Sequence, residues 1–191
     1  MNEKNTILKL MTICLVMVFS VLSISVTADA ATNKVVCKKY TYNTRKQAPV
    51  LKVDKTYQIA YKGTRGVVQF EAPKSKVYTF SFSNYRSIGI SKNKDLGYVT
   101  VIPFDDDCYK EMEKNKNLFS WLEWKSLQYD DDSFLEFGSK RYSSQSGSDF
   151  YVSTSNKGKL KLKKGEVIYL EFDNWVGNKT YKGFTCNLKI K

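Results

Sequence analysis

The chain has 191 residues, with 31 lysines and arginines, 19 aspartates and glutamates, no histidine, and a formal net charge of +12. The absence of histidine excludes serine–histidine and cysteine–histidine nucleophile pairs, histidine general bases and histidine zinc ligands. The net positive charge favours a polyanionic partner such as an anionic wall polymer. The alternative is an ordinary solvated face, because the lysines alternate along strands. Sequence-specific nucleic-acid recognition is not expected, because arginine is scarce and no known reading module is present.

Residues 1–30 have the layout of a secretory signal peptide. Two lysines precede an apolar run, residues 10–26, and the small residues Ala28 and Ala30 lie where a signal peptidase cleaves. We expect cleavage after Ala30 and a secreted protein, residues 31–191, with no remaining transmembrane segment. The alternative is an uncleaved membrane anchor, because the apolar run approaches the roughly 20 residues that span a bilayer. The mature segment has the usual length of one domain.

Most of the mature sequence alternates apolar and polar side chains with a period of two, which is typical of half-buried strands. The short strands and intervening turns predict an all-β fold, an antiparallel β-sandwich that resembles a jelly roll. The stretch 157–175 is predicted to be a hairpin that turns at Gly165. The residues predicted to face inward are Tyr57, Ile59, Tyr61, Val68, Phe70, Ala72, Tyr78, Phe80, Phe82, Leu160, Leu162, Ile168, Leu170, Phe172, Phe184, Cys186, Leu188 and Ile190.

The segment 104–125 is an insertion without a clear strand pattern. Its first part, "DDDCYKEMEKNKN", is compatible with a short helix capped by Asp105 or Asp106. Its second part, "LFSWLEWKS", fits a helical turn and a strand equally well.

Three cysteines remain after signal cleavage. Cys37 lies near the mature start and Cys186 near the end, and secretion permits a disulfide, so we expect a Cys37–Cys186 bridge and a free Cys108. The aspartates before Cys108 should raise its thiol pKa, which is the reverse of an activating environment. The alternative is three reduced cysteines.

Two aspartate runs suggest calcium as the one candidate cofactor. Asp105 and Asp107 lie in the first run, and Asp130 and Asp132 in the second. Calcium takes six to eight oxygen ligands in irregular geometry, which two such loops can supply. The alternative is two solvated loops that offset nearby lysines.

The three tryptophans, Trp121, Trp124 and Trp175, are the candidate ligand-binding residues. Exposed aromatic rings on a β-sandwich stack against sugar rings, and Trp175 is expected to be the most exposed, in a loop after the strand end "EFDN". The alternative is ordinary burial of large amphipathic side chains.

Two parts of the chain resemble a known family. "GVVQFEAPKSKVYTFSFSN", followed by "LKLKKGEVIYLEFDN" and "YKGFTCNLKIK", is similar to the bacterial pre-peptidase C-terminal domain in residues 63–84 and 157–191. The resemblance implies a β-sandwich that serves as an accessory module of secreted bacterial enzymes, with its "YTF" strand paired to the preceding strand. This chain departs from the family by the long insertion between Pro103 and Phe134, and no functional residue carries over.

We therefore expect a secreted, noncatalytic module that binds a glycan, a cell-wall polymer or a protein at the bacterial cell surface. The alternative is a structural or protein-interaction domain that acts through its basic surface without a small ligand. A glycosidase needs only two carboxylates, but acids scattered over surface strands are common, so an enzyme is not expected. The carboxylates available in principle are Glu123, Glu136, Glu166 and Glu171.

Overall fold

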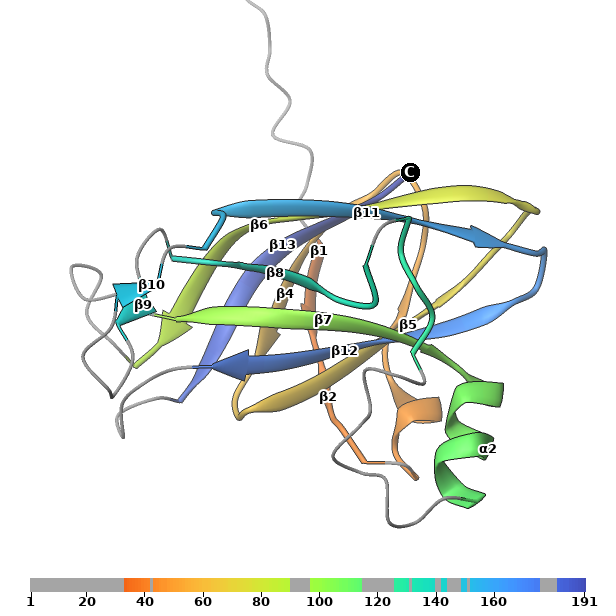
Figure 1. Cartoon of the computed structure of the whole chain (residues 1–191), viewed down its shortest axis with the longest axis horizontal. Helices are drawn as coiled ribbons and strands as arrows, with labels where there is room; N and C mark the ends of the chain where they lie inside the picture. The colour runs from red at the N-terminus through yellow and green to blue at the C-terminus, as the bar shows by residue number, and fades with distance from the viewer. Residues whose placement is uncertain are drawn as a thin grey trace, which may run out of the picture. The chain divides into compact units, whose positions relative to one another are not determined.

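The computed structural model describes residues 33–41, 43–89, 97–114, 126–130, 132–139, 142–143, 149–150, 152–175 and 182–191. Two β-sheets pack face to face, as Figure 1 shows. We call them sheet A and sheet B. The predicted signal peptide, residues 1–30, lies outside the described residues, and those from Asn33 onward belong to one compact unit.

Sheet A has five strands. In spatial order they are β1 (Asn33–Val36), β4 (Thr56–Tyr61), β13 (Gly183–Ile190), β6 (Lys76–Ile88) and β11 (Ser155–Leu162). Sheet B has the order β2 (Lys38–Lys39), β5 (Arg65–Glu71), β12 (Val167–Trp175), β7 (Tyr98–Asp105) and β8 (Leu135–Gly138), and β3 (Val50–Leu51) also pairs with β5. A separate ribbon joins β9 (Tyr142–Ser143) to β10 (Asp149–Phe150).

The connections between the long strands are those of a jelly roll. Strands β4, β5, β6 and β7 alternate between the two sheets, and β11, β12 and β13 alternate again. The order β4-β13-β6-β11 therefore faces the order β5-β12-β7-β8, which is the eight-strand arrangement of a jelly roll. The predicted all-β, jelly-roll-like sandwich is confirmed. It is antiparallel except for the short edge pairs β1–β4 and β3–β5, which are parallel.

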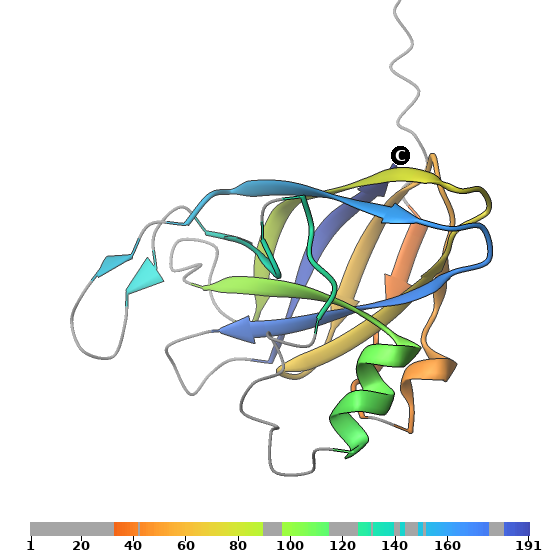
Figure 2. The same ribbon diagram turned by 45° about the vertical axis from the view of Figure 1, so that its right-hand side comes forward.

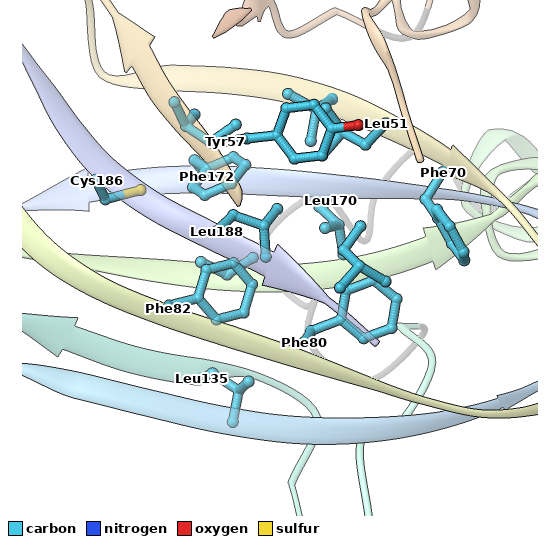
Figure 3. Close-up of a cluster of buried hydrophobic side chains, with 14 of the residues drawn as sticks. Leu51, Tyr57, Phe70, Phe80, Phe82, Leu135, Leu170, Phe172, Cys186 and Leu188 are labelled. Carbon is cyan, nitrogen blue, oxygen red and sulfur yellow. The ribbon is translucent and has the colours of Figure 1, made fainter. Parts of the chain in front are cut away.

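The space between the sheets holds one large apolar core. Every residue predicted to face inward is buried in it, because alternate side chains of each strand point to one face. Figure 3 shows aromatic and aliphatic side chains from both sheets meeting there. Phe82 of sheet A, for example, packs edge-on against Phe172 of sheet B, with ring centroids 6.1 Å apart.

The predicted hairpin at residues 157–175 is wrong. Strand β11 pairs with β6 in sheet A, whereas β12 pairs with β5 and β7 in sheet B. Gly165, with φ of 80°, turns the chain from one sheet to the other. Its N–H donates to the Ala72 carbonyl at 2.8 Å, beside the crossover from β5 to β6. That crossover also separates β5 from the "YTF" strand β6, so the pairing implied by the resemblance is absent.

A short helix, α2 (Asp106–Lys114), packs on the outer face of sheet B (Figure 2). Asp105 caps it, because Asp105 Oδ1 accepts a hydrogen bond from Cys108 N at 2.7 Å, as predicted for one of the two candidate caps. Arg45 of the 3-10 helix η1 (Arg45–Gln47) stacks over the Tyr109 ring at 4.4 Å and bonds Asp106 at 3.1 Å. These contacts hold α2 and η1 together on one part of the outer face of sheet B.

The expected Cys37–Cys186 disulfide does not form, and Cys37, Cys108 and Cys186 are all free thiols. Cys186 pairs with Ile59 on one side of β4, while Cys37 donates to the Ala60 carbonyl on the other side. Strand β4 thus separates the two cysteines by about two strand spacings, or roughly 10 Å, and a disulfide needs Cα atoms within about 7 Å.

Among the residues that the structure describes, no helix has the length and apolar character needed to cross a membrane.

Candidate aromatic binding site

Trp175 is the last residue of β12 rather than part of a loop, and it is 51% exposed. Because Leu170 and Phe172 face the core, the alternation along β12 directs Trp175 to the outer face of sheet B. It lies directly opposite Tyr98 on β7. The two rings stack with centroids 6.4 Å apart and an angle of 15° between their planes. We call these two stacked rings the aromatic pair.

The row of paired residues that contains the aromatic pair ends at a residue that lines a polar depression. Tyr98 pairs with Gly138 on β8, so Trp175, Tyr98 and Gly138 form one row across three strands. Gly138 lines a depression of about 570 Å³. Gly138 lies about two strand spacings, on the order of 10 Å, from Trp175 if strands keep their usual separation. The lining residues are Ser83, Asn84, Tyr85, Arg86, Gly138, Ser139, Thr154 and Ser155.

A buried hydrogen-bond network joins the depression to the end of β12. Tyr85 lines the depression and donates from its hydroxyl to Asn174 Oδ1 at 2.8 Å. The same hydroxyl shares a hydrogen bond with Ser87 Oγ at 2.9 Å. Asn174 precedes Trp175, and its own N–H donates to the Thr64 carbonyl at 3.0 Å. The backbone that carries Trp175 is therefore fixed to both sheets.

The polar residues nearest to Trp175 on the same face are also ordered. Asp173, two residues earlier, accepts two hydrogen bonds from Arg65 at 2.8 and 3.0 Å. These hydrogen bonds, together with the charges of Asp173 and Glu171, raise the pKa of Arg65, against the effect of burial. The Arg65 guanidinium therefore stays positively charged, and it lies one row of cross-strand residues away from the aromatic pair.

The sequence singled out only part of this site. Trp175 is in it, whereas Trp121 and Trp124 lie outside the described residues. Tyr98 was missed, although its position in "LGYVTV" places it on the opposite face from the buried Val99 and Val101. Asn84 was also missed. It has a φ of 56° and lies at a β-bulge, where β6 has two residues opposite Cys186 of β13.

Three of the four aspartates proposed for calcium have other partners in this structure. Asp105 caps α2, Asp107 bonds Lys110 at 2.7 Å, and Asp130 accepts from Lys159 N at 2.8 Å. Asp132 lines a different depression, of about 300 Å³, with Glu136. Over the described ranges, which omit Asp131, no group of three or more acidic or cysteine side chains is placed to hold a metal ion. The structure gives the calcium interpretation no support.

A comparison with protein-family models finds no match, and a comparison with curated proteins finds no similar sequence. The aromatic pair and the depression are therefore the features of this structure that bear on function.

Proposed function

We propose that this protein is a secreted, noncatalytic jelly-roll module that binds a glycan at the bacterial cell surface. The observation that carries the proposal is the half-exposed, nearly parallel stack of Trp175 on Tyr98 at one end of the sandwich. A sugar ring presents an apolar C–H face that packs on such a surface, and burying that face removes apolar area from water. The pre-peptidase C-terminal resemblance, which stays a prediction, also implies a β-sandwich.

The depression supplies the polar half of the site. Hydroxyl, amide and guanidinium groups line it, and each donates or accepts hydrogen bonds of the kind that sugar hydroxyls make. Such a combination of a few placed polar groups with aromatic surface is typical of small-ligand sites. The spacing between Trp175 and Gly138 suits a ligand of two or more sugar rings.

The test is binding of the mature protein to isolated cell walls and to insoluble polysaccharides, at low and at high salt. Trp175→Ala should weaken salt-resistant binding by roughly tenfold or more, as truncation of an aromatic anchor does. Trp175→Tyr keeps a ring and should retain most of it. Val77→Ala is the matched control, because Val77 on sheet A is also 51% exposed.

The melting temperature of each variant distinguishes binding from folding. Trp175→Ala should melt close to wild type, because its side chain is at the surface. Unfolding of Trp175→Ala would make the tryptophan a structural residue and contradict the proposal. Loss of all wild-type binding at high salt would contradict it as well, and would favour a domain that acts through its basic surface.

A further inference from the structure

Charge is divided unequally between the two sheets. The strands of sheet A contain no aspartate or glutamate, and their basic residues are Lys34, Lys76, Arg86, Lys157, Lys159, Lys161 and Lys189. The strands of sheet B carry more acidic than basic residues, namely Glu71, Asp105, Glu136, Glu171 and Asp173 against Lys38, Lys39 and Arg65. Because the outer faces of a sandwich point in opposite directions, the positive charge of the strands is concentrated on one side of the domain.

The register arranges the basic side chains on the outer face of sheet A. Lys157, Lys159 and Lys161 project from the same side of β11, about 6.7 Å apart, since alternate residues of a strand share a face. Lys189 of β13 lies in the same row as Lys157, with Ser81 of β6 between them. The lysines therefore form a line along β11, with Lys189 about 10 Å to one side.

Uncharged polar residues fill the space between these cations. Among the described residues, an acidic group pairs with only one of the lysines on this face, where Asp130 lies 3.5 Å from Lys159. Lys157, Lys161 and Lys189 are exposed, and none of them has an acidic partner within the part of the chain that the structure describes. The intervening outward residues are Thr79, Ser81, Ser83, Thr185, Asn187 and Gln58.

The face is exposed to solvent, and none of the aromatic residues in the five described strands points outward from it. Val36 and Val77, which point outward from β1 and β6, are 69% and 51% exposed. Helix α2 and η1 pack on sheet B instead. The tyrosines and phenylalanines of sheet A all point into the core. A membrane-binding surface needs apolar anchors among its basic residues, and a single-stranded nucleic-acid surface needs aromatic rings for base stacking. Among the described residues, this face has no aromatic ring, and its two exposed valines are smaller than the Trp, Phe and Leu side chains that anchor such surfaces.

Lysine rather than arginine supplies almost all of the charge, and Arg86 is the only arginine in the five strands. Arginine suits bidentate pairing with carboxylates, whereas the lysine ammonium is a compact point charge that binds phosphate without fixed geometry. A line of lysines at regular spacing matches a flexible chain whose phosphates recur along its length.

We propose that the outer face of sheet A is a docking surface for a flexible linear polyanion, other than a nucleic acid, whose phosphate groups recur along its backbone. This surface meets the depression at Ser83 and Arg86 but does not include the aromatic pair, and the inference does not rest on the proposed glycan binding. The lysines act by releasing the counterions of the polymer, so binding weakens as salt increases.

The test measures binding of poly(glycerol phosphate) and of inorganic polyphosphate over a range of salt concentrations. The variant Lys157→Gln/Lys161→Gln/Lys189→Gln removes three charges from sheet A. Its matched control, Lys38→Gln/Lys39→Gln/Lys164→Gln, removes three exposed charges from β2 and the β11–β12 turn. The sheet A variant should lose tenfold or more in affinity. Each phosphate contact contributes roughly 0.7 to 0.9 to the slope of log affinity against log salt, so the loss of three contacts should flatten that slope by about two.

The control variant should bind both polymers within about twofold of wild type, and so should Trp175→Ala, which separates this inference from the glycan site. Equal losses in the two triple variants would show that only net charge matters and would overturn the proposal. Tighter binding to phosphatidylglycerol vesicles or to duplex DNA than to either polymer would also overturn it, in favour of a membrane or a nucleic acid.

Discussion

Arg65 lies beside the buried carboxylate of Glu171 without donating a hydrogen bond to it, since Arg65 Nε is 3.7 Å from Glu171 Oε1. Arg65 directs its hydrogen bonds to Asp173 instead. Within the described part of the chain, neither oxygen of Glu171 has a hydrogen-bond partner, and the residue is only 1% exposed. Burial raises the pKa of Glu171 to about 7; the charge of Asp173 adds to this effect, and the charge of Arg65 opposes it.

The first prediction concerns pH. Because the pKa of Glu171 is higher in the folded state than its ordinary value of 4.5, the folded state holds this proton more tightly than the unfolded state. The contribution of Glu171 to stability is therefore fully present below about pH 4.5 and is lost as pH rises to about 7, by roughly 3 kcal/mol in all. Glu171→Gln should be more stable than wild type at about pH 8.

Urea unfolding of both proteins between about pH 4 and pH 8 measures this difference. The gain from Glu171→Gln should grow as pH rises. Glu71→Gln, at the exposed end of β5, is the control and should show no such growth. A constant difference between wild type and Glu171→Gln across the range would contradict the prediction.

The second prediction concerns the cap of α2. Asp105→Ala removes the acceptor of the Cys108 N–H and should cost about 1 kcal/mol, within the usual range of 0.5 to 2. Asp105→Asn keeps an oxygen acceptor and should be close to wild type. Thermal unfolding with chelator and with calcium tests both variants. A calcium-dependent melting temperature that Asp105→Asn abolishes would show that the carboxylate is a metal ligand instead.

The third prediction concerns the thiols. Cys37 and Cys186 are buried, which raises the pKa of both. Burial also raises the pKa of Cys108 to about 12, against a backbone hydrogen bond at Asp105 that lowers it. Alkylation of the folded protein near pH 8 should be slow at all three, because the thiolate is the reactive form. In denaturant without reductant, all three should be labelled. Labelling of Cys108 alone would instead demonstrate a Cys37–Cys186 bridge.

The fourth prediction concerns the core strand β12. Leu170 is fully buried between the sheets, as Figure 3 shows. Leu170→Ala should lower the free energy of unfolding by about 2 to 5 kcal/mol, because it removes buried methyl groups and leaves a cavity. Lys161→Ala, at the exposed edge strand β11, should melt close to wild type. Similar melting temperatures for the two variants would contradict the assignment of Leu170 to the core.

The alternation of side chains along each strand was sufficient to assign much of the core. Phe82, Leu170 and Leu188 face inward as predicted, because the period of two is a local property of extended backbone and does not depend on which strands are neighbours. The cap of α2 was also predictable, because it is a local contact between two residues only three positions apart, Asp105 and Cys108. The calcium interpretation of the aspartate runs stays a prediction, and composition does not reveal that Asp105, Asp107 and Asp130 accept hydrogen bonds from nearby backbone N–H groups and a lysine.

Only the tertiary structure decided which strands pair. The sequence from β11 to β12 has the same alternation whether its turn closes a hairpin or crosses between sheets, and hydrogen bonding to β6, β5 and β7 selects the crossover. The same long-range pairing places Tyr98 against Trp175, residues from strands far apart in the chain. It also gathers the lysines of β11 and β13 on one face. Hydrophobic alternation specifies which side of a strand is buried, but the neighbours of a strand depend on the packing of the whole sandwich.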